Sequence, residues 1–302
     1  MTTGRLERAL AEGRFAITAE LGPPKSADAE VVRRKARELR PHVDAANITD
    51  NQTAVARMSS LAGAAIMLSE GLEPVMQVVS RDRNRLALTS ELLGAGALKV
   101  PNVMCLGGDP VHVGNHPEAK SVHDLDAVGL IRLAAGLVEG RFSNGEPCDP
   151  APRLFVGSGE NPFNDTSGGE RLAAKVRAGA RFIQTQAIFD VEAFGAWMSV
   201  VRSHGLHEKV AILAGIVPLK SARMAGYMRE KVPGVVLPLE VVERMGKADT
   251  KEAARLVGIE IAAELIEQLR EIRGIGGIHV MAVEWEEAVG QVLEAANLGR
   301  GR

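Results

Sequence analysis

Short apolar runs typical of β-strands alternate with longer helical segments along the whole chain, and this alternation constrains the fold most strongly. Eight runs are strand candidates: Phe15–Leu21, Val43–Ile48, Pro74–Val79, Asn102–Leu106, Arg153–Gly157, Phe182–Gln186, Val210–Gly215 and Ile278–Val283. Helical periodicity is found between them, at 31–39, 86–93, 128–137, 170–178 and 253–272. Eight strand–helix units in 302 residues predict a closed (β/α)₈ barrel.

An open, doubly wound sheet is the alternative, and it normally carries a glycine-rich nucleotide motif between its first strand and helix. Here Gly157-Ser158-Gly159 is followed by Glu-Asn-Pro, and Gly274-Ile275-Gly276-Gly277 precedes a strand. Both contexts contradict that motif. We therefore expect a single domain over residues 1–302, with an elaborated loop at 110–120 and extra helices between strands seven and eight, at 233–272.

Composition excludes several classes of function. A net charge of −2 and an aromatic content of 3% disfavour nucleic-acid binding. Arg5, Glu7, Arg8 and Glu12 interrupt any apolar leader, and no stretch is long enough for a membrane helix. Two cysteines cannot form a disulfide framework, and Cys105 lies in an apolar run typical of a core. A cytoplasmic protein is expected.

The active site of such a barrel lies at the carboxyl ends of its strands, so polar residues there are the candidates. Glu20 ends the first strand before a Gly-Pro-Pro turn, and a partly buried carboxyl group with a raised pKa is a candidate proton donor. The fourth strand ends in Leu106-Gly107-Gly108-Asp109. Its glycines allow a flat ligand to approach the backbone closely, beside a carboxylate.

Amide side chains occupy equivalent places on other strands. Asn47 and Gln77 are candidate ligand contacts, and Gln184 and Gln186 share a face of strand six by alternation. Amides on such a face can hydrogen-bond the edge of a heterocycle. For Asp50 and Asn51 we favour helix capping, and for the charged run 80–85 a solvated helix start with i,i+4 pairs.

Two further features leave alternatives open. His112, His116 and His123 lie in one loop with Asp124 and Asp126, but their spacing fits no compact metal motif, so loop hydrogen bonding is favoured. Lys175 lies on a predicted helix. It either contacts a phosphate group or is an exposed lysine, and spacing alone favours neither.

Taken together, these residues resemble the 5,10-methylenetetrahydrofolate reductase family, in its short, single-barrel branch. The resemblance covers nearly the whole chain and rests on five segments in the right order: Ala19–Pro24, Leu106–Asp109, Lys175–Ala180 with Gln184–Glu192, Ala214–Pro218 and Gly277–His279. The segment His116–Asp126 is also similar to that branch.

The resemblance implies FAD bound at the barrel mouth and reduction of methylenetetrahydrofolate to methyltetrahydrofolate. It assigns the general acid to Glu20 and the tuning of the flavin to Asp109. Substrate contacts would fall on Gln186 and Gln77. Cofactor contacts would come from Asn47, Gly107, Gly108, Asp109, Val122 and Lys175.

This chain departs from the family pattern at two places that bear on the electron donor. Met76-Gln77-Val78 replaces a threonine-bearing segment on strand three, and Ala222 replaces an aromatic residue after strand seven. NAD(P)H or an electron-delivering partner protein therefore both stay open as the source of electrons, and so does a homo-oligomer. The alternative functions are a flavin-free, pterin-binding methyltransferase barrel and a non-catalytic subunit.

Overall fold

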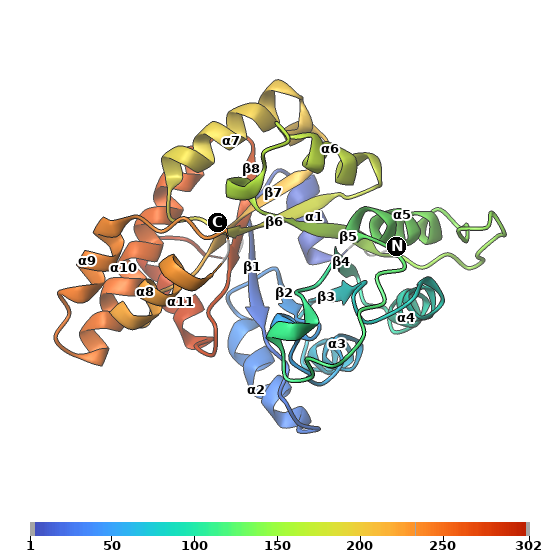
Figure 1. The fold of residues 1–302 in the computed structure, drawn as a ribbon, viewed down its shortest axis with the longest axis horizontal. Coiled ribbons are helices and arrows are strands. Elements are labelled where there is room, and N and C mark those ends of the chain that lie inside the picture. The colour runs from blue at the N-terminus through green and yellow to red at the C-terminus, as the bar shows by residue number, and fades with distance from the viewer. Residues whose placement is uncertain (1–3, 233, 300–302) are drawn as a thin grey trace.

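The computed structural model describes residues 4–232 and 234–299, and its eight strands form one closed parallel barrel in sequence order (Figure 1). This confirms the (β/α)₈ prediction. The strands are β1 (Ala16–Leu21), β2 (Ala45–Ile48), β3 (Pro74–Val79), β4 (Asn102–Leu106), β5 (Phe155–Glu160), β6 (Phe182–Ala187), β7 (Ala211–Ile216) and β8 (Ile275–Val280).

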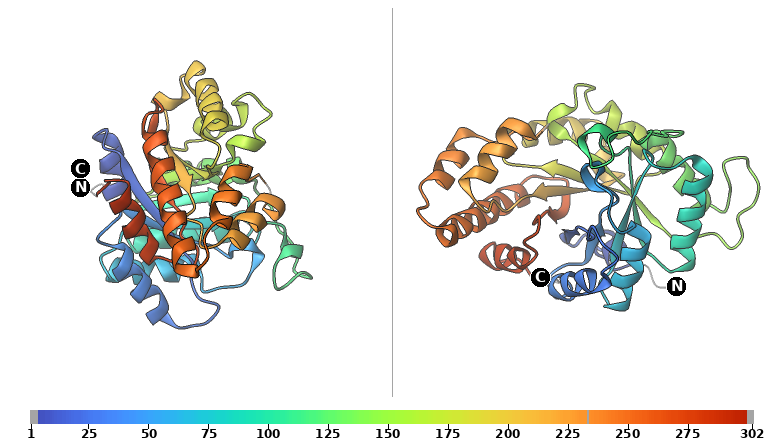
Figure 2. Two further views of the ribbon diagram at one scale, coloured as in Figure 1. Left: turned by 90° about the vertical axis from the view of Figure 1, so that its left-hand side faces the viewer. Right: turned by 60° about the horizontal axis from the view of Figure 1, so that its bottom comes forward.

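The helices are α1 (Arg5–Ala11), α2 (Ala29–Leu39), α3 (Ser60–Ser69), α4 (Arg85–Ala97), α5 (Ala127–Val138), α6 (Glu170–Arg177), α7 (Val191–Ser203), α8 (Ala222–Lys231), α9 (Leu239–Gly246), α10 (Lys251–Arg270) and α11 (Glu287–Ala295). Helices α2–α10 connect successive strands, whereas α1 precedes β1 and α11 follows β8. The expected extra helices between β7 and β8 are confirmed, and α8–α10, in orange, gather at one side (Figures 1 and 2). Within the described residues, every helix is too short or too polar to cross a membrane.

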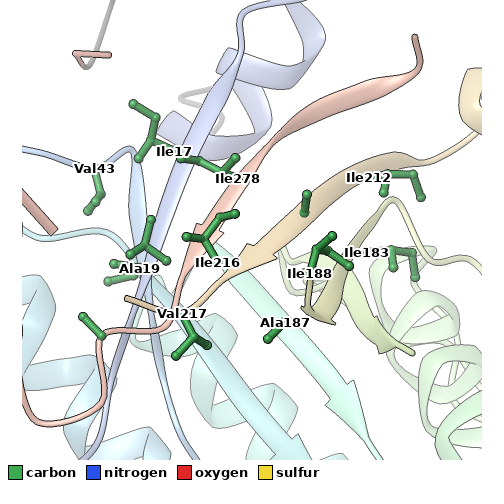
Figure 3. Close-up of a cluster of buried hydrophobic side chains, with 14 of the residues drawn as sticks. Ile17, Ala19, Val43, Ile183, Ala187, Ile188, Ile212, Ile216, Val217 and Ile278 are labelled. Atoms are coloured by element: carbon green, nitrogen blue, oxygen red, sulfur yellow. The ribbon is translucent and has the colours of Figure 1, made fainter. Parts of the chain in front are cut away.

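Strand alternation divides the side chains between two environments. On β1, Ile17 and Ala19 belong to the large apolar cluster between the barrel and its helices, with Ile183, Ile212 and Ile278 (Figure 3). Because successive residues of a strand point to opposite faces, Thr18 and Glu20 face the barrel interior. The alternation of apolar and polar residues along β1 therefore places the Glu20 carboxyl group inside the barrel.

The amino-terminal end of the barrel is closed by α1. Leu6 and Ala9 of this helix pack against the lower interior residues Val75, Phe155 and Phe182. The helix itself is anchored by Glu73, whose carboxylate accepts hydrogen bonds from the backbone N–H groups of Arg5 and Leu6. The barrel interior at this end is therefore filled with apolar side chains.

The largest differences from the predicted strand boundaries are at β5 and β8. β5 is Phe155–Glu160 rather than 153–157, and β8 is Ile275–Val280 rather than 278–283. Glycines that indicated strand ends are instead strand residues where another group approaches closely. A Cβ on Gly157 would lie 2.3 Å from Cζ of Phe182, and one on Gly277 would lie 2.1 Å from the Ala16 carbonyl oxygen.

Gly157→Ala tests this packing requirement. The added methyl group would overlap the buried Phe182 ring, so we expect a loss of about 1–3 kcal/mol in the free energy of unfolding. Gly195→Ala on α7 is the matched control, because a Cβ there meets no atom within 4 Å. It should leave stability unchanged or raise it by up to about 1 kcal/mol. Chemical denaturation measures both, and equal stabilities would contradict the proposed overlap.

Candidate active site at the mouth of the barrel

A pocket of about 720 Å³ lies at the carboxyl ends of the strands. Its lining brings together most of the residues predicted from the sequence: Glu20, Asn47, Gln77, Gly107, Gly108, Asp109, Lys175, Gln184 and Gln186. A larger hollow of about 850 Å³ lies near the start of β3, but its carboxylate, Glu73, already caps α1. The mouth of the barrel is therefore the candidate site.

Glu20 lies deep in this pocket, with its side chain only 14% exposed. Burial raises the pKa of its carboxyl group to about 7, although hydrogen bonds from Gln52 and Gln77 act in the opposite direction. The Gln52 amide nitrogen donates to Oε1 at 3.2 Å. Near neutral pH a large fraction of Glu20 therefore carries a proton that it can donate.

His279 of β8 approaches Glu20 from below, with Nε2 4.0 Å from Oε2. The Thr18 hydroxyl donates to the Ile278 carbonyl at 3.1 Å, so its oxygen is left to accept from Nδ1–H of His279 at 3.0 Å. Burial lowers the pKa of His279 to about 3. The ring is therefore neutral and directs an unprotonated nitrogen toward Glu20. The sequence prediction placed β8 three residues too far along the chain, and for this reason it did not single out His279.

Amides of Asn47 and Gln184 form the floor of the pocket. Asn47 Nδ2 donates to Gln184 Oε1 at 2.6 Å, and Gln184 Nε2 donates back to Asn47 Oδ1 at 3.0 Å. Gln184 also donates to Thr18 at 3.3 Å. Asn47 is fully buried, so its predicted cofactor contact would require this pair to open. Gln186 lies higher, where the register of β6 with β7 shifts.

Asp109 and the two glycines form the wall opposite Glu20. A Cβ on Gly107 would meet no atom within 4 Å, so the wall is open at this residue, whereas a Cβ on Gly108, whose φ is +89°, would lie 3.0 Å from Cβ of Arg81. The Asp109 carboxylate accepts a hydrogen bond from the Thr53 backbone N–H at 2.9 Å. The predicted juxtaposition of a carboxylate with exposed backbone is therefore present at this end of β4.

A buried arginine, Arg81, joins the loops that follow β2, β3 and β4. Its guanidinium donates to the carbonyls of Asp109 and Asn51 and to the carboxylate of Asp82. The interpretation of 80–85 as a solvated helix start is therefore wrong at Arg81, whose side chain is 2% exposed. The partners that pull it inward lie on other loops, and the local charge pattern does not reveal them.

The expected capping by Asp50 and Asn51 is also wrong. Asp50 accepts from the Val79 backbone N–H and pairs with Arg83 at 2.7 Å. Asn51 makes no side-chain cap and instead accepts from the Arg57 backbone N–H. Both side chains therefore hold the loops of the mouth rather than a helix end.

Lys175 is a buried member of an ion cluster, which decides against an exposed helix lysine. Its ammonium donates to the Gly159 carbonyl and, at 2.9 Å, to the carboxylate of Glu160. Arg171 pairs with the same carboxylate. The negative charge of Glu160 balances only one of the two cations, Lys175 and Arg171, so this rim of the pocket carries a net positive charge. Glu160 was missed because β5 extends three residues beyond its predicted end.

Val122 and the loop histidines lie outside this lining. Val122 is 45% exposed, and its backbone N–H donates to the Arg81 carbonyl. Asp124, near His123, pairs with Arg85 at 2.8 Å. In the part of the chain that the structure describes, no group of three His, Cys, Asp or Glu side chains is arranged to hold a metal ion.

Comparison with known proteins decides the family. The family model described as methylenetetrahydrofolate reductase matches residues 5–297. The chain belongs to the methylenetetrahydrofolate reductase family. Methylenetetrahydrofolate reductase 1 of Schizosaccharomyces pombe is 30% identical over 65% of this chain and 31% of its own length. Methylenetetrahydrofolate reductase (NADH) 1 of Arabidopsis thaliana is 29% identical over 66% of this chain and 33% of its own.

The chain thus spans about a third of the length of these curated members of the family. Among solved structures, an uncharacterised Clostridium thermocellum protein that binds two copies of 5-methyl-5,6,7,8-tetrahydrofolic acid aligns with a TM-score of 0.63 and 15% identity, over 96% of this chain and 97% of its own. An oxaloacetate acetylhydrolase aligns with a TM-score of 0.53 and 12% identity, over 92% and 79%. At identities this low, the structural alignments show a shared barrel fold and nothing further.

The raised pKa of Glu20 predicts a pH-dependent effect of Glu20→Gln on stability. The folded protein holds this proton more tightly than the unfolded chain, whose pKa is 4.5, so the stabilising contribution is present below pH 4.5 and is lost as the pH rises to about 7. Glutamine does not titrate, so Glu20→Gln does not lose this stabilising contribution as the pH rises. Its free energy of unfolding relative to the parent should therefore increase by on the order of 3 kcal/mol between pH 4 and pH 8.

Denaturant titrations at several pH values measure this difference. Glu118→Gln is the control, because that side chain is 76% exposed in a loop outside the pocket. A parallel pH dependence of the parent and Glu20→Gln would contradict the raised pKa.

Proposed function

We propose that the protein reduces 5,10-methylenetetrahydrofolate to 5-methyltetrahydrofolate, with Glu20 as the proton donor. The observation that carries this proposal is a carboxyl group with a pKa of about 7 deep in a pocket lined by amides and open backbone. The family match and the names of the curated relatives support the reaction class. The folate bound by the Clostridium thermocellum protein supports a folate ligand for this barrel shape.

Opening of the imidazolidine ring needs a proton on a weakly basic nitrogen, which a neutral carboxylic acid can supply near physiological pH. Glu20 meets this requirement because burial keeps much of it protonated. The neutral His279 nitrogen 4.0 Å away adds no positive charge that would expel the proton. After transfer, hydrogen bonds from Gln52 and Gln77 stabilise the carboxylate that remains.

Ring opening produces a cationic iminium, and the Asp109 carboxylate is the anion placed to stabilise it. It lines the same pocket as Glu20. Gln186 and Gln77 are the amides proposed to hydrogen-bond the pterin edge. The protonated acid and the anion thus serve successive steps of one reaction.

FAD is the proposed cofactor, and the lining suits it in two respects. The Gly107–Gly108 wall admits a flat ring, and the Lys175–Arg171–Glu160 cluster leaves a positive charge for a phosphate group. When bound, the flavin supplies the hydride. Its electrons would come from NAD(P)H or from a partner protein. Anaerobic reduction with NADH, NADPH or a reduced dye separates these sources, since reduction by the dye alone indicates a partner.

A methyltransferase that uses methyltetrahydrofolate without flavin is the second candidate. The pocket amides Gln77 and Gln186 favour it equally, because amides can hydrogen-bond a pterin edge in either reaction. The absorption spectrum of the purified protein distinguishes the two. A bound flavin band supports the reductase, whereas a colourless protein that binds folate tightly and takes up no added FAD supports the methyltransferase.

Glu20→Gln should abolish folate reduction while leaving flavin reduction intact. The amide cannot donate the proton, and loss of a general acid costs about 10²–10⁴-fold in rate. Stopped-flow measurement of the two half-reactions separates them, and Glu118→Gln again serves as the control. Normal folate turnover in Glu20→Gln would refute the assignment of the acid.

Gln186→Ala should weaken folate binding more than flavin binding. The lost amide contact is expected to raise the folate KM about tenfold, with a smaller change in the flavin Kd. Steady-state kinetics and flavin fluorescence titration give the two constants. Equal losses in both would indicate that Gln186 supports the shape of the β6 bulge instead.

A further inference from the structure

The turn that carries Gln52 has an unusual backbone. Residues Gln52–Ala54 form the short 3₁₀ segment η1, which follows β2. Asn51, Thr53 and Ala54 have φ values of 44°, 54° and 55°. Residues other than glycine rarely adopt this left-handed region, and a β-branched threonine does so least readily. Such strain persists only where the surrounding structure holds it, and it is concentrated at functional sites.

Neighbouring loops hold this turn from the side of β4. The Asp109 carboxylate accepts from the Thr53 backbone N–H at 2.9 Å, and Asn115 accepts from the Ala56 N–H at 2.9 Å. Gly114 lies so close that a Cβ there would be 1.8 Å from the Ala54 carbonyl oxygen. The strained conformation is therefore imposed by the loop that begins with Asp109.

The turn delivers one side chain into the pocket. Gln52 Nε2 donates to Glu20 Oε1 at 3.2 Å, so the same turn contacts Asp109 through its backbone and Glu20 through this side chain. We propose that Gln52 is a positioning residue for Glu20, and that Asp109 controls it by fastening the turn that carries it. This inference rests on the proposed function in one respect only, namely that Glu20 is the proton donor.

The hydrogen bond from Gln52 shifts the pKa of Glu20 in a definite direction. An amide N–H that donates to a carboxyl oxygen stabilises the ionised form, so Gln52 lowers the pKa of Glu20 from the value that burial alone would produce. A ligand with a cationic or N–H group that binds Asp109 competes with the Thr53 N–H and loosens the turn. Glu20 then retains its proton more strongly, as a donor should before the ring opens.

Other groups near Glu20 do not replace this control. His279 on β8 is the nearest titratable side chain, and its pKa of about 3 keeps it neutral. Apart from Asp109, whose carboxylate accepts from the Thr53 N–H, the remaining charges of the lining occur in pairs or clusters: Asp50 with Arg83, Arg81 with Asp82, and Glu160 with Lys175 and Arg171. Gln77 also hydrogen-bonds Glu20, but it extends from β3 and not from the turn.

The test is the titration of Glu20 in the free protein, followed by NMR of carboxyl-labelled glutamate and assigned with Glu20→Gln. Gln52→Leu should raise the titration midpoint of Glu20 by about half a unit to one unit, because the donor is lost. Asp109→Ala should produce a similar rise, since the Thr53 N–H loses its acceptor. The double variant should shift no further than Gln52→Leu alone.

Asp109→Asn is the decisive control, because it removes the charge but keeps an oxygen that can accept from Thr53. If the turn is the link, this variant leaves the midpoint unchanged or lowers it slightly through the lost negative charge. If Asp109→Ala does not fold, Asp109→Ser, with a side chain too short to span the same distance, takes its place with the same expectation.

An unchanged midpoint in Gln52→Leu would overturn the proposal, and so would equal midpoints in Asp109→Ala and Asp109→Asn. Neither result depends on catalysis. Failure of Glu20→Gln to lose folate reduction would refute the proposed function and leave these titrations interpretable.

Discussion

The desolvation of one carboxyl group is the constraint on which the rest of the site depends. Glu20 is carried into the barrel because Ile17 and Ala19 alternate with it on β1 and must face the helices. Burial then raises the pKa of Glu20 to about 7, and only the uncharged amides of Gln52 and Gln77 oppose the shift. A lysine or arginine in their place would favour the ionised form of Glu20 and remove the proposed proton donor.

Below Glu20, the side chains of Thr18, His279, Gln184 and Asn47 are joined to one another by hydrogen bonds. Thr18 accepts from His279 and from Gln184, and Gln184 exchanges two hydrogen bonds with Asn47. A buried network that is fully connected is rigid, whereas an incomplete one is costly. This network fixes the His279 ring with its unprotonated nitrogen toward Glu20, so the acid lies above a preorganised, neutral floor.

The sequence was sufficient for the barrel and for most of its mouth, because both depend on local patterns. Strand alternation and the glycines after β4 placed Glu20, Gln77, Gln186 and Asp109 around one opening. The predictions that were wrong or missing concern residues whose positions depend on contacts between distant segments of the chain. Gly157 and Gly277 are strand residues because Phe182 and β1 approach them, and misjudging those strands concealed Glu160 and His279. Arg81 and Gln52 likewise owe their positions to partners about thirty residues away.

Those distant contacts also join the two carboxyl groups to which we assign the chemistry of the pocket. The proposed acid, Glu20, belongs to β1 and the proposed anion, Asp109, follows β4, and these two strands are not neighbours in the barrel. The loop after β2 spans the gap, with its backbone bound to Asp109 and its Gln52 amide bound to Glu20. Arg81 holds both ends of this connection through the carbonyls of Asn51 and Asp109. A strained loop is suited to this place, because the energy stored in its left-handed residues favours release once the Asp109 carboxylate has another partner.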